Sequence, residues 1–203
     1  MLKTFPKDLL VTLRLMVVLT VVCCFAYTYA VTGVANVLFP SQAAGSLITH
    51  NGQVVGSQLI GQAFTQDKYF QGRPSPTVSE TDATKAAPYN AQNSSGSNLA
   101  PSNQALVDRV RQAVADLKKA NPTLSGDVPV DLVTGDFAGL DPYISPASAE
   151  LQVPRIAAAR KLDPAKVMAL VQAHTDGRTL GMMGEPHVNV LALNLALDDG
   201  AAG

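Results

Sequence analysis

The sequence predicts an α+β protein with one N-terminal transmembrane helix followed by a single mixed α/β extracytoplasmic domain. Three observations predict it: residues 15–39 carry no charge, Lys and Arg are distributed unevenly around them, and both strand and helix patterns occur along residues 40–203. A chain of 203 residues has room for one domain with a core beyond such a span, and too little for two. The predicted organisation is therefore a cytoplasmic N-terminus (1–14), a transmembrane helix (15–39) and an extracytoplasmic soluble domain (40–203).

The uncharged stretch is long enough to cross a bilayer. A helix over residues 15–39 covers a hydrocarbon core of about 30 Å and pairs its own backbone groups, which lipid requires. The alternative is a cleaved secretory signal, with a cut after Ala30 or Ala35. The apolar run continues beyond Ala30 and contains no strict Ala-x-Ala triplet, so the sequence favours an uncut anchor.

The positive charges flanking the span predict its orientation. Lys3, Lys7 and Arg14 precede it, whereas the first basic residue after it is Lys68. Basic residues are retained in the cytoplasm, so we expect the N-terminus inside and the domain outside. Both cysteines lie within the span, so no disulfide is expected in the outer domain.

Small residues recur along one face of the predicted span. Ala26 and Ala30 are four residues apart, and Gly33 follows near the next turn. This spacing lets a second helix approach closely, although such residues are also simply frequent in membrane helices. We therefore expect these three residues to contact another membrane subunit.

The first part of the domain predicts a hairpin followed by a long loop. Asn51-Gly52 supplies the positive-φ pair of a type I′ turn between residues 45–50 and 53–57. Residues 72–103 are dominated by Pro, Ser, Thr, Asn, Gln, Ala and Gly and show no helical or strand period. A connection of this length is either functional or disordered.

Helical periodicity and turn residues predict three helices and two strands in the remainder. Apolar positions 106, 107, 110, 113, 114 and 117 predict an amphipathic helix over 103–120, capped by Ser102. Alternation predicts a short strand over 128–132. The remaining expectations are a helix from Ser145-Pro146 to about 161 kinked at Pro154, a helix from Asp163-Pro164 closed by Asp176-Gly177, and a buried strand over 187–195.

The motifs of an enzyme are missing from the sequence. It contains no GxxxxGK[ST] phosphate loop, no Asp-Lys-Thr-Gly-Thr phosphorylation motif and no GxSxG elbow, and its histidines lack metal-ligand spacing. We therefore expect no catalytic residues and no metal. With 15 basic and 16 acidic residues, the net charge of −1 does not indicate a nucleic-acid partner. An anchored extracytoplasmic enzyme or a binding module unrelated to transport remain alternatives.

Several short motifs follow the span in order and together cover nearly the whole chain. They are Gly-Ser-Leu-Ile (45–48), Ile-Gly-Gln-Ala-Phe (60–64), Tyr-Phe-x-Gly-Arg-Pro-Ser (69–75), Ser-Gly-Ser-Asn-Leu (95–99), Asp-Leu-Val-Thr (131–134), Gly-Leu-Asp-Pro-Tyr-Ile-Ser-Pro (139–146), Gln-x-Pro-Arg (152–155) with Ala-Arg (159–160), and Gly-Glu-Pro-x-Val-Asn-Val-Leu (184–191). This set of motifs resembles that of the KdpC family, the C subunits of bacterial Kdp potassium-transporting P-type ATPases.

The resemblance implies a non-catalytic accessory subunit of the bacterial inner membrane. In that family the complex couples ATP hydrolysis in one subunit to high-affinity potassium uptake through a channel-like subunit. The C subunit is implied to serve assembly and to act as a catalytic chaperone that raises the ATP affinity of the hydrolysing subunit. It has no cofactor of its own, because ATP and K⁺ are handled by the complex. Gln152 matches the glutamine proposed for nucleotide binding.

The predicted topology disagrees with a nucleotide role for Gln152, because ATP does not reach a domain outside the cytoplasm. We instead expect the span to dock against the other membrane subunits and the outer domain to sit over the potassium entrance. Four further residues in the shared motifs are expected either to contact a partner or to hold the long loop onto the domain: Arg73, Asn98, Asp141 and Arg155.

Overall fold

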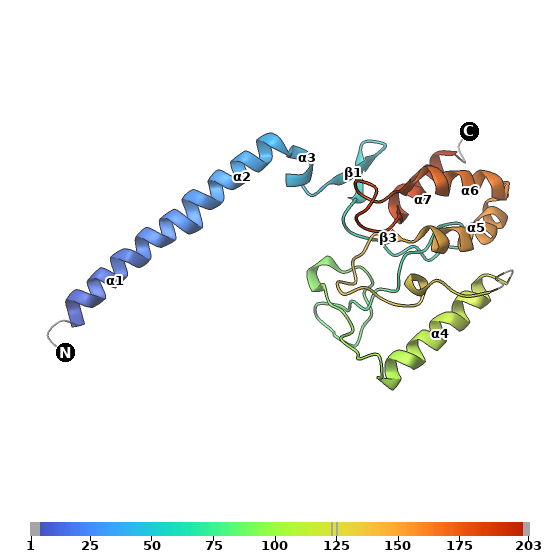
Figure 1. Cartoon of the computed structure of the whole chain (residues 1–203), viewed down its shortest axis with the longest axis horizontal. Helices are drawn as coiled ribbons and strands as arrows, with labels where there is room; N and C mark the ends of the chain where they lie inside the picture. Colours follow the sequence, from blue (N-terminus) through green and yellow to red (C-terminus); the bar gives the residue numbers. More distant parts are fainter. Residues whose placement is uncertain (1–4, 123, 125, 201–203) are drawn as a thin grey trace. The chain divides into compact units, whose positions relative to one another are not determined.

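The computed structural model describes residues 5–122, 124 and 126–200. The chain divides after residue 47 into two compact units, an N-terminal helical unit and a larger globular unit (Figure 1). The globular unit combines helices with two small antiparallel sheets, which confirms the predicted α+β class.

The N-terminal unit is one long helix of three segments. These are α1 (Phe5–Leu19), the π-helical η1 (Thr20–Ala26) and α2 (Tyr27–Leu38). The helix Pro6–Leu38 contains an 18-residue stretch with a mean hydropathy of 2.5, so by length and composition it could cross a membrane. Phe39 ends it at φ −136° before the short turn α3 (Pro40–Ala43).

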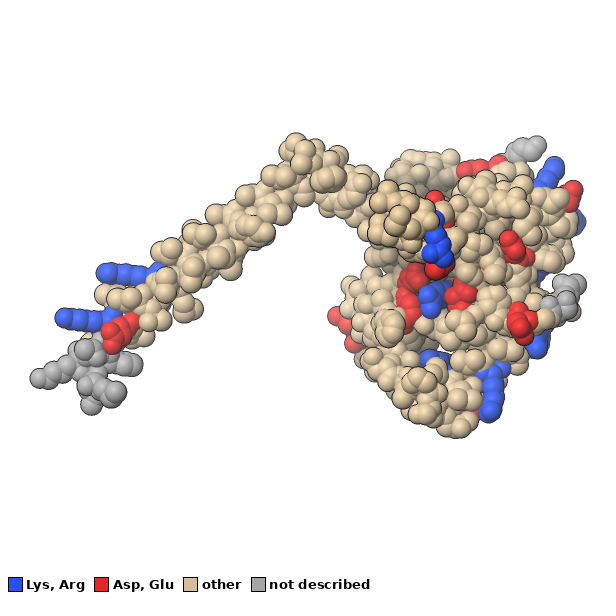
Figure 2. Space-filling model, in the orientation of Figure 1, with Lys and Arg blue, Asp and Glu red and all other residues tan. Residues whose placement is uncertain are grey.

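The helix begins ahead of the predicted span, because residues 5–14 are also helical. Pro6 lies in the first turn, where its missing N–H costs nothing, and Asp8 complements the helix dipole there. Charged side chains appear at one end of this helix only, and the rest of its surface is uncharged (Figure 2). The membrane boundaries at 15 and 39, and the side on which each end lies, remain predictions.

The predicted hairpin is confirmed. Strand β1 (Leu47–His50) pairs with β2 (Gln53–Ser57) in a two-stranded sheet. Asn51 and Gly52 have φ values of 50° and 77°, the positive pair that a type I′ turn requires.

A second sheet joins three short strands from distant parts of the chain. β5 (His187–Asn189) lies between β3 (Tyr143–Ile144) and β4 (Thr175–Asp176), and both pairings are antiparallel. In the register, Val188 faces Ile144 on one side and Thr175 on the other. The fully buried Val188 therefore anchors the sheet to the core.

The predicted strand over 187–195 is wrong beyond its third residue. Helix α7 (Val190–Gly200) starts there because Asn189 accepts a hydrogen bond from the Ala192 N–H through its side chain. Val190, Leu193 and Leu197 are all buried, and their spacing has the helical period rather than the strand period.

Two further helices complete the core layer. Helix α5 (Pro146–Arg160) is capped by Ser145, whose hydroxyl accepts from the Ser148 N–H, and Pro154 lies within it without ending it. Helix α6 (Pro164–Ala173) begins at the predicted Asp163 cap. It ends before the predicted Asp176-Gly177, because residues 175–176 pair with β5 as β4.

The core lies where α5, α6 and α7 pack against each other and the second sheet. Phe70 is fully buried there, although it belongs to an extended segment outside any helix or sheet. The other core residues are Ile144, Ala149, Val153, Ile156, Ala157, Val167, Val171, Val188, Val190, Leu193 and Leu197.

Helix α4 (Gln104–Ala120) has its expected length but a different cap. The side chain of Asn103, not Ser102, accepts the Ala105 N–H, because Asn103 has the extended backbone of an N-cap, at φ −74° and ψ 124°. Every position of the predicted apolar stripe is only half-buried.

Two other expectations for this region have clear outcomes. The strand over 128–132 is wrong: Val130–Leu132 form the 3-10 turn η3, with the Leu132 N–H bonded to the Pro129 carbonyl. The loop 72–103 carries one short helical turn, η2 (Ala91–Asn93), and an isolated bridge between Val78 and Ala86. Near its two ends it is hydrogen-bonded to the rest of the domain, by Ser75 to the Gly139 carbonyl and by Ser95 to the Ala138 carbonyl.

Candidate functional site

Segment 67–71 starts in a turn, lies outside any strand and is held by side chains. Each of its five consecutive carbonyl oxygens accepts a hydrogen bond from a side chain on α5 or α7. The donors, in carbonyl order, are Arg155, Arg160, Arg155 again, Asn194 and Gln152. The side chains of two helices thus do what a sheet partner normally does.

Gln152 binds both backbone groups of Gln71, the last residue of this segment. It is 1% exposed, and its Oε1 accepts from the Gln71 N–H at 2.8 Å and from Arg155 Nη2 at 2.8 Å. Its Nε2 donates to the carbonyls of Gln71 at 3.1 Å and Ser148 at 3.2 Å. Both oxygen lone pairs and both N–H groups are occupied, so a nucleotide could bind this amide only after these bonds break.

Asn194 repeats the arrangement one residue earlier. Its Oδ1 accepts from the Phe70 N–H at 2.8 Å, and its Nδ2 donates to the Phe70 carbonyl at 3.0 Å. The side chain is 1% exposed, and its polar groups therefore have the partners that burial requires.

Two arginines extend the contact toward the start of the segment. Arg155 also donates to Asn121 Oδ1 at 3.2 Å, which ties the C-terminal end of α4 to α5. Burial lowers the pKa of Arg155 from its usual value, and the negative charge of Asp67 opposes this shift. Arg160 bonds Asp198 on α7 at 2.7 Å and stacks over the Tyr69 ring at 5.0 Å.

Arg73 and Asp141 form a partly buried ion pair just beyond this segment. Arg73 Nη1 lies 3.1 Å from Asp141 Oδ2, and Nη2 donates to the Gly135 carbonyl at 3.3 Å. Arg73 Nε is buried and has no hydrogen-bond partner among the described residues. The pair joins the start of the long loop to the connection before β3.

Tyr89 fixes the middle of the loop to the same place. Its hydroxyl donates to the Arg73 carbonyl at 2.7 Å, and its ring occupies the space beside Gly61 and Gly72. A Cβ on either glycine would come within 2.4 Å of Tyr89 atoms, so only glycine fits. Burial first, and then the negative charges of Asp136 and Asp141, raise the pKa of Tyr89 to about 12, with Arg73 acting in the opposite direction.

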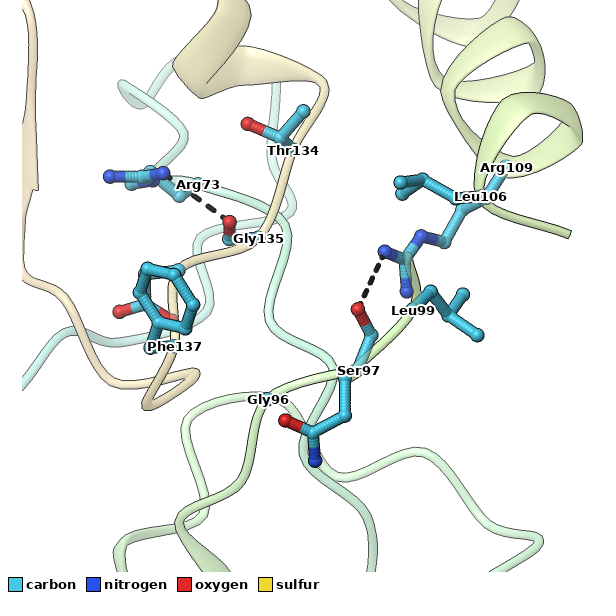
Figure 3. A pocket seen from close by; sticks show the side chains of 11 residues that line it. Arg73, Gly96, Ser97, Leu99, Leu106, Arg109, Thr134, Gly135 and Phe137 are labelled. Carbon is cyan, nitrogen blue, oxygen red and sulfur yellow. Dashed lines mark hydrogen bonds between the residues drawn. The ribbon is translucent and has the colours of Figure 1, made fainter. Parts of the chain in front are cut away.

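A pocket of about 330 Å³ opens between the loop and α4 (Figure 3). Leu106 and Arg109 on α4 lie on one side, and Thr134, Gly135 and Phe137 on the other. Arg109 Nη2 donates to Ser97 Oγ at 3.2 Å across the edge of the pocket. Its lining combines polar groups with apolar ones and contains neither a nucleophile with an adjacent base nor a set of metal ligands.

The residues singled out in the sequence fall into three places. Gln152 and Arg155 contact each other in the side-chain set on segment 67–71. Arg73 and Asp141 pair at the loop, and Asn98, which is exposed with a left-handed φ of 51°, lines the pocket together with Arg73. In the separate helical unit, the predicted helix-contact residues are exposed: Ala26, Ala30 and Gly33.

The sequence analysis assigned no role to several residues that the structure makes central: Tyr89, Arg109, Phe137, Arg160 and Asn194. Asn194 carried a detectable signal, because it is a polar residue between Leu193 and Leu197 on what proves to be a buried helix face. The others occupy stretches whose local pattern is that of ordinary surface. Among the described residues no group of three His, Cys, Asp or Glu side chains is placed to hold a metal ion.

Comparison with known proteins gives a consistent result. The model of the family described as "K+-transporting ATPase, c chain" (KdpC) matches residues 9–199. The chain is 58% identical over 196 residues to the potassium-transporting ATPase KdpC subunit of Rhodopseudomonas palustris, covering 95% of this chain and 96% of that protein.

Two further relatives carry the same description. The KdpC subunit of Bradyrhizobium diazoefficiens is 55% identical over 192 residues, and that of Methylobacterium nodulans is 57% identical over 192 residues. In both cases the similarity covers 93% of this chain and 94% of the relative.

Proposed function

The chain belongs to the KdpC family of K⁺-transporting ATPase c chains, and from this membership we propose that it is an accessory subunit of a high-affinity, ATP-driven potassium uptake complex. It takes part in assembly and carries out no catalytic step itself. It raises the ATP affinity of the hydrolysing subunit, while ATP and K⁺ are bound elsewhere in the complex. The observation that carries the proposal is the family match over residues 9–199.

The helix Pro6–Leu38 serves as an uncut, single-pass anchor in the bacterial inner membrane. Its face with Ala26, Ala30 and Gly33 packs against a helix of a partner subunit. The support for this contact is that a Cβ at Gly33 would meet no atom within 4 Å, so the face is open to close approach.

The globular unit lies outside the cytoplasm, over the potassium entrance of the channel-like subunit. In support, this unit exposes large apolar side chains that water solvates poorly. Leu180 is 81% exposed, Met182 75% and Phe137 98%. Large apolar side chains exposed to this degree are typical of surfaces that a partner covers.

Gln152 acts within the chain and does not bind nucleotide. Its amide is saturated by the bonds to Gln71, Ser148 and Arg155, and 1% of the residue is exposed. On this proposal the effect on ATP affinity is indirect: a correctly folded C subunit stabilises the assembly in which the hydrolysing subunit binds ATP.

Affinity purification of the tagged full chain from its native membrane in mild detergent tests the function. The expected result is co-purification with a subunit carrying the Asp-Lys-Thr-Gly-Thr phosphorylation motif and with a channel-like membrane subunit, together with K⁺-stimulated ATP hydrolysis. A matched control replaces residues 6–38 with an unrelated membrane span and should retain less of both partners. Recovery of the full chain alone would contradict the proposal and favour an independent binding module.

A further inference from the structure

Arg109 brings an uncompensated positive charge to the pocket between α4 and the loops. It takes part in none of the ion pairs that form within residues 5–122, 124 and 126–200. Its hydrogen bond to Ser97 involves a neutral hydroxyl, which leaves the guanidinium charge unbalanced. A planar guanidinium binds a carboxylate through two parallel hydrogen bonds, so the missing partner has a definite chemistry.

The other charges at the pocket already have partners. Arg73 is paired with Asp141 at 3.1 Å. The Asp136 carboxylate accepts the Asp141 N–H at 2.7 Å and also the Gly139 N–H, so it is directed into its own loop. The lining therefore holds one charge of each sign without an ion-pair partner, Arg109 and Asp136, and of these two only the Asp136 carboxylate is bound by backbone N–H groups.

The apolar side chains that line the pocket are also incompletely covered. The Phe137 side chain lies on the side opposite Arg109 in Figure 3 and is 98% exposed. Leu99 and Leu106 line the other side and are only half-buried. An exposed Phe and an Arg without an ion-pair partner in one pocket are characteristic of protein–protein contact centres, where both residue types are enriched.

The backbone fixes the geometry of the pocket before anything binds. A Cβ at Gly96 would lie 2.8 Å from the Phe137 carbonyl oxygen, so the two loops touch directly. The Ser95 N–H and the Ser94 hydroxyl both donate to the Ala138 carbonyl, at 3.0 and 3.1 Å. A preformed pocket binds with little loss of conformational entropy.

We propose that this pocket docks an extended segment of a partner subunit that presents a carboxylate to Arg109 beside an apolar side chain packed on Phe137 and the two leucines. The inference rests on the proposed function, which supplies the partner subunits. Charge complementarity identifies the occupant: a purely apolar segment leaves Arg109 unpaired, and a small anion leaves Phe137 uncovered.

The test uses the assembled complex purified through a tag on a partner subunit. A photo-crosslinking phenylalanine analogue replaces Phe137, and the product is identified by mass spectrometry. The expected product joins this position to a partner peptide that contains Asp or Glu next to an apolar residue. Crosslinks confined to this chain, to a second copy of it or to lipid would overturn the proposal.

Paired arginine variants on α4 provide the quantitative arm. Arg109→Ala should release the chain from the complex about tenfold faster. Arg111→Ala is the matched control, because its side chain is 72% exposed and is paired with Asp108 outside the pocket, and it should behave as wild type. In a second pair, Arg109→Glu should weaken association, and Lys in place of the crosslinked partner carboxylate should restore it.

The outcomes separate this inference from the function itself. If wild-type chain assembles and Arg109→Ala dissociates at the wild-type rate, the pocket proposal is wrong while the function stands. If the wild-type chain fails to assemble with any transport subunit, the proposed function has failed first. Weakening of Arg111→Ala equal to that of Arg109→Ala would indicate a general charge effect and also count against a specific pocket.

Discussion

At the scale of single residues, Gln152 and Asn194 each bind the N–H and the C=O of one residue in segment 67–71. Their partners, Gln71 and Phe70, are 81 and 124 positions away in the sequence. A side-chain amide has the same donor and acceptor as a backbone peptide, so it can replace a missing strand neighbour. These two residues therefore connect the segment that carries Phe70 into the core.

Replacing Gln152 tests whether the residue is structural. Gln152→Ala leaves the backbone groups of Gln71 without partners and opens a cavity, so we expect a loss of about 2–4 kcal/mol in the free energy of unfolding. For a chain of this size that lowers Tm by about 5–10 °C, measured by thermal unfolding of the full chain in detergent. The exposed Gln172→Ala is the matched control and should change stability by less than about 0.5 kcal/mol.

The same variant distinguishes the two roles of Gln152. At a temperature where Gln152→Ala remains folded and assembled, the ATP affinity of the complex should equal that of the wild type. A large loss of ATP affinity without a loss of stability would instead support direct nucleotide binding.

Tyr89 predicts a specific alkaline sensitivity. Its folded-state pKa of about 12 lies above the ordinary value of 10, so the folded state favours the neutral phenol. This contribution is fully present below pH 10 and is lost as the pH rises through 12. A shift of two units corresponds to roughly 3 kcal/mol at most.

The measurement is the free energy of unfolding between pH 9 and pH 12 for wild type and Tyr89→Phe. Near pH 9 the variant should be about 1 kcal/mol less stable, because it lacks the hydrogen bond to the Arg73 carbonyl. Toward pH 12 the difference should shrink or reverse, since phenylalanine does not ionise. Parallel pH curves would show that Tyr89 does not govern the alkaline loss.

At the scale of elements, the turn between β4 and β5 is an isolated apolar projection. Thr179 pairs with Met183 in a single bridge, and Arg178 is bonded to Glu185 at 2.5 Å below it. Leu180 at φ 54° and the neighbouring Met182 extend from this closed base into solvent. The turn keeps its shape through its own backbone, so its tip contributes little to folding.

We therefore predict that the double variant Leu180→Asn with Met182→Ser assembles poorly while folding normally. Asn tolerates the left-handed backbone at position 180, so Tm should change by no more than about 2 °C. Retention in the purified complex should fall several-fold, as judged by subunit ratios after extended washing. Val54→Ser, which removes a 61% exposed side chain from the separate hairpin, is the control and should assemble as wild type.

The observed starts of the hairpin and the helices also show which sequence-based predictions are correct, and why. The hairpin at Asn51-Gly52 and the helix starts at Ser145 and Asp163 depend on residues within one turn, and all three were predictable. The strand over 128–132 failed because Asp131 is held elsewhere: its carboxylate accepts the Ser145 N–H at 2.7 Å and the Ser148 hydroxyl at 2.6 Å. A strand pattern in sequence does not reveal such a partner.

At the scale of the whole molecule, the chain combines a long apolar helix with a globular unit that has its own core. The basic residues before position 15 predict that the globular unit is exported. This orientation underlies the argument that Gln152 does not meet cytoplasmic ATP.

Reporter fusions after Gly203 check the orientation. A phosphatase that folds only outside the cytoplasm should be active there, and a fluorescent protein that matures only in the cytoplasm should be dark. Replacing Lys7 and Arg14 with Gln should reduce phosphatase activity, because fewer positive charges retain the N-terminus inside. A bright cytoplasmic reporter with an inactive phosphatase would reverse the assigned topology.

The sequence by itself determined the apolar span, the family, the hairpin and the helix caps at Ser145 and Asp163, because each depends on neighbouring residues or on motifs in order. Only the tertiary structure decided which distant residues meet. Arg73 and Asp141 are 68 positions apart and Gln152 and Gln71 are 81 apart, so no local period connects them. Side-chain amides and guanidiniums satisfy the backbone of segment 67–71 only because folding brings α5 and α7 beside it.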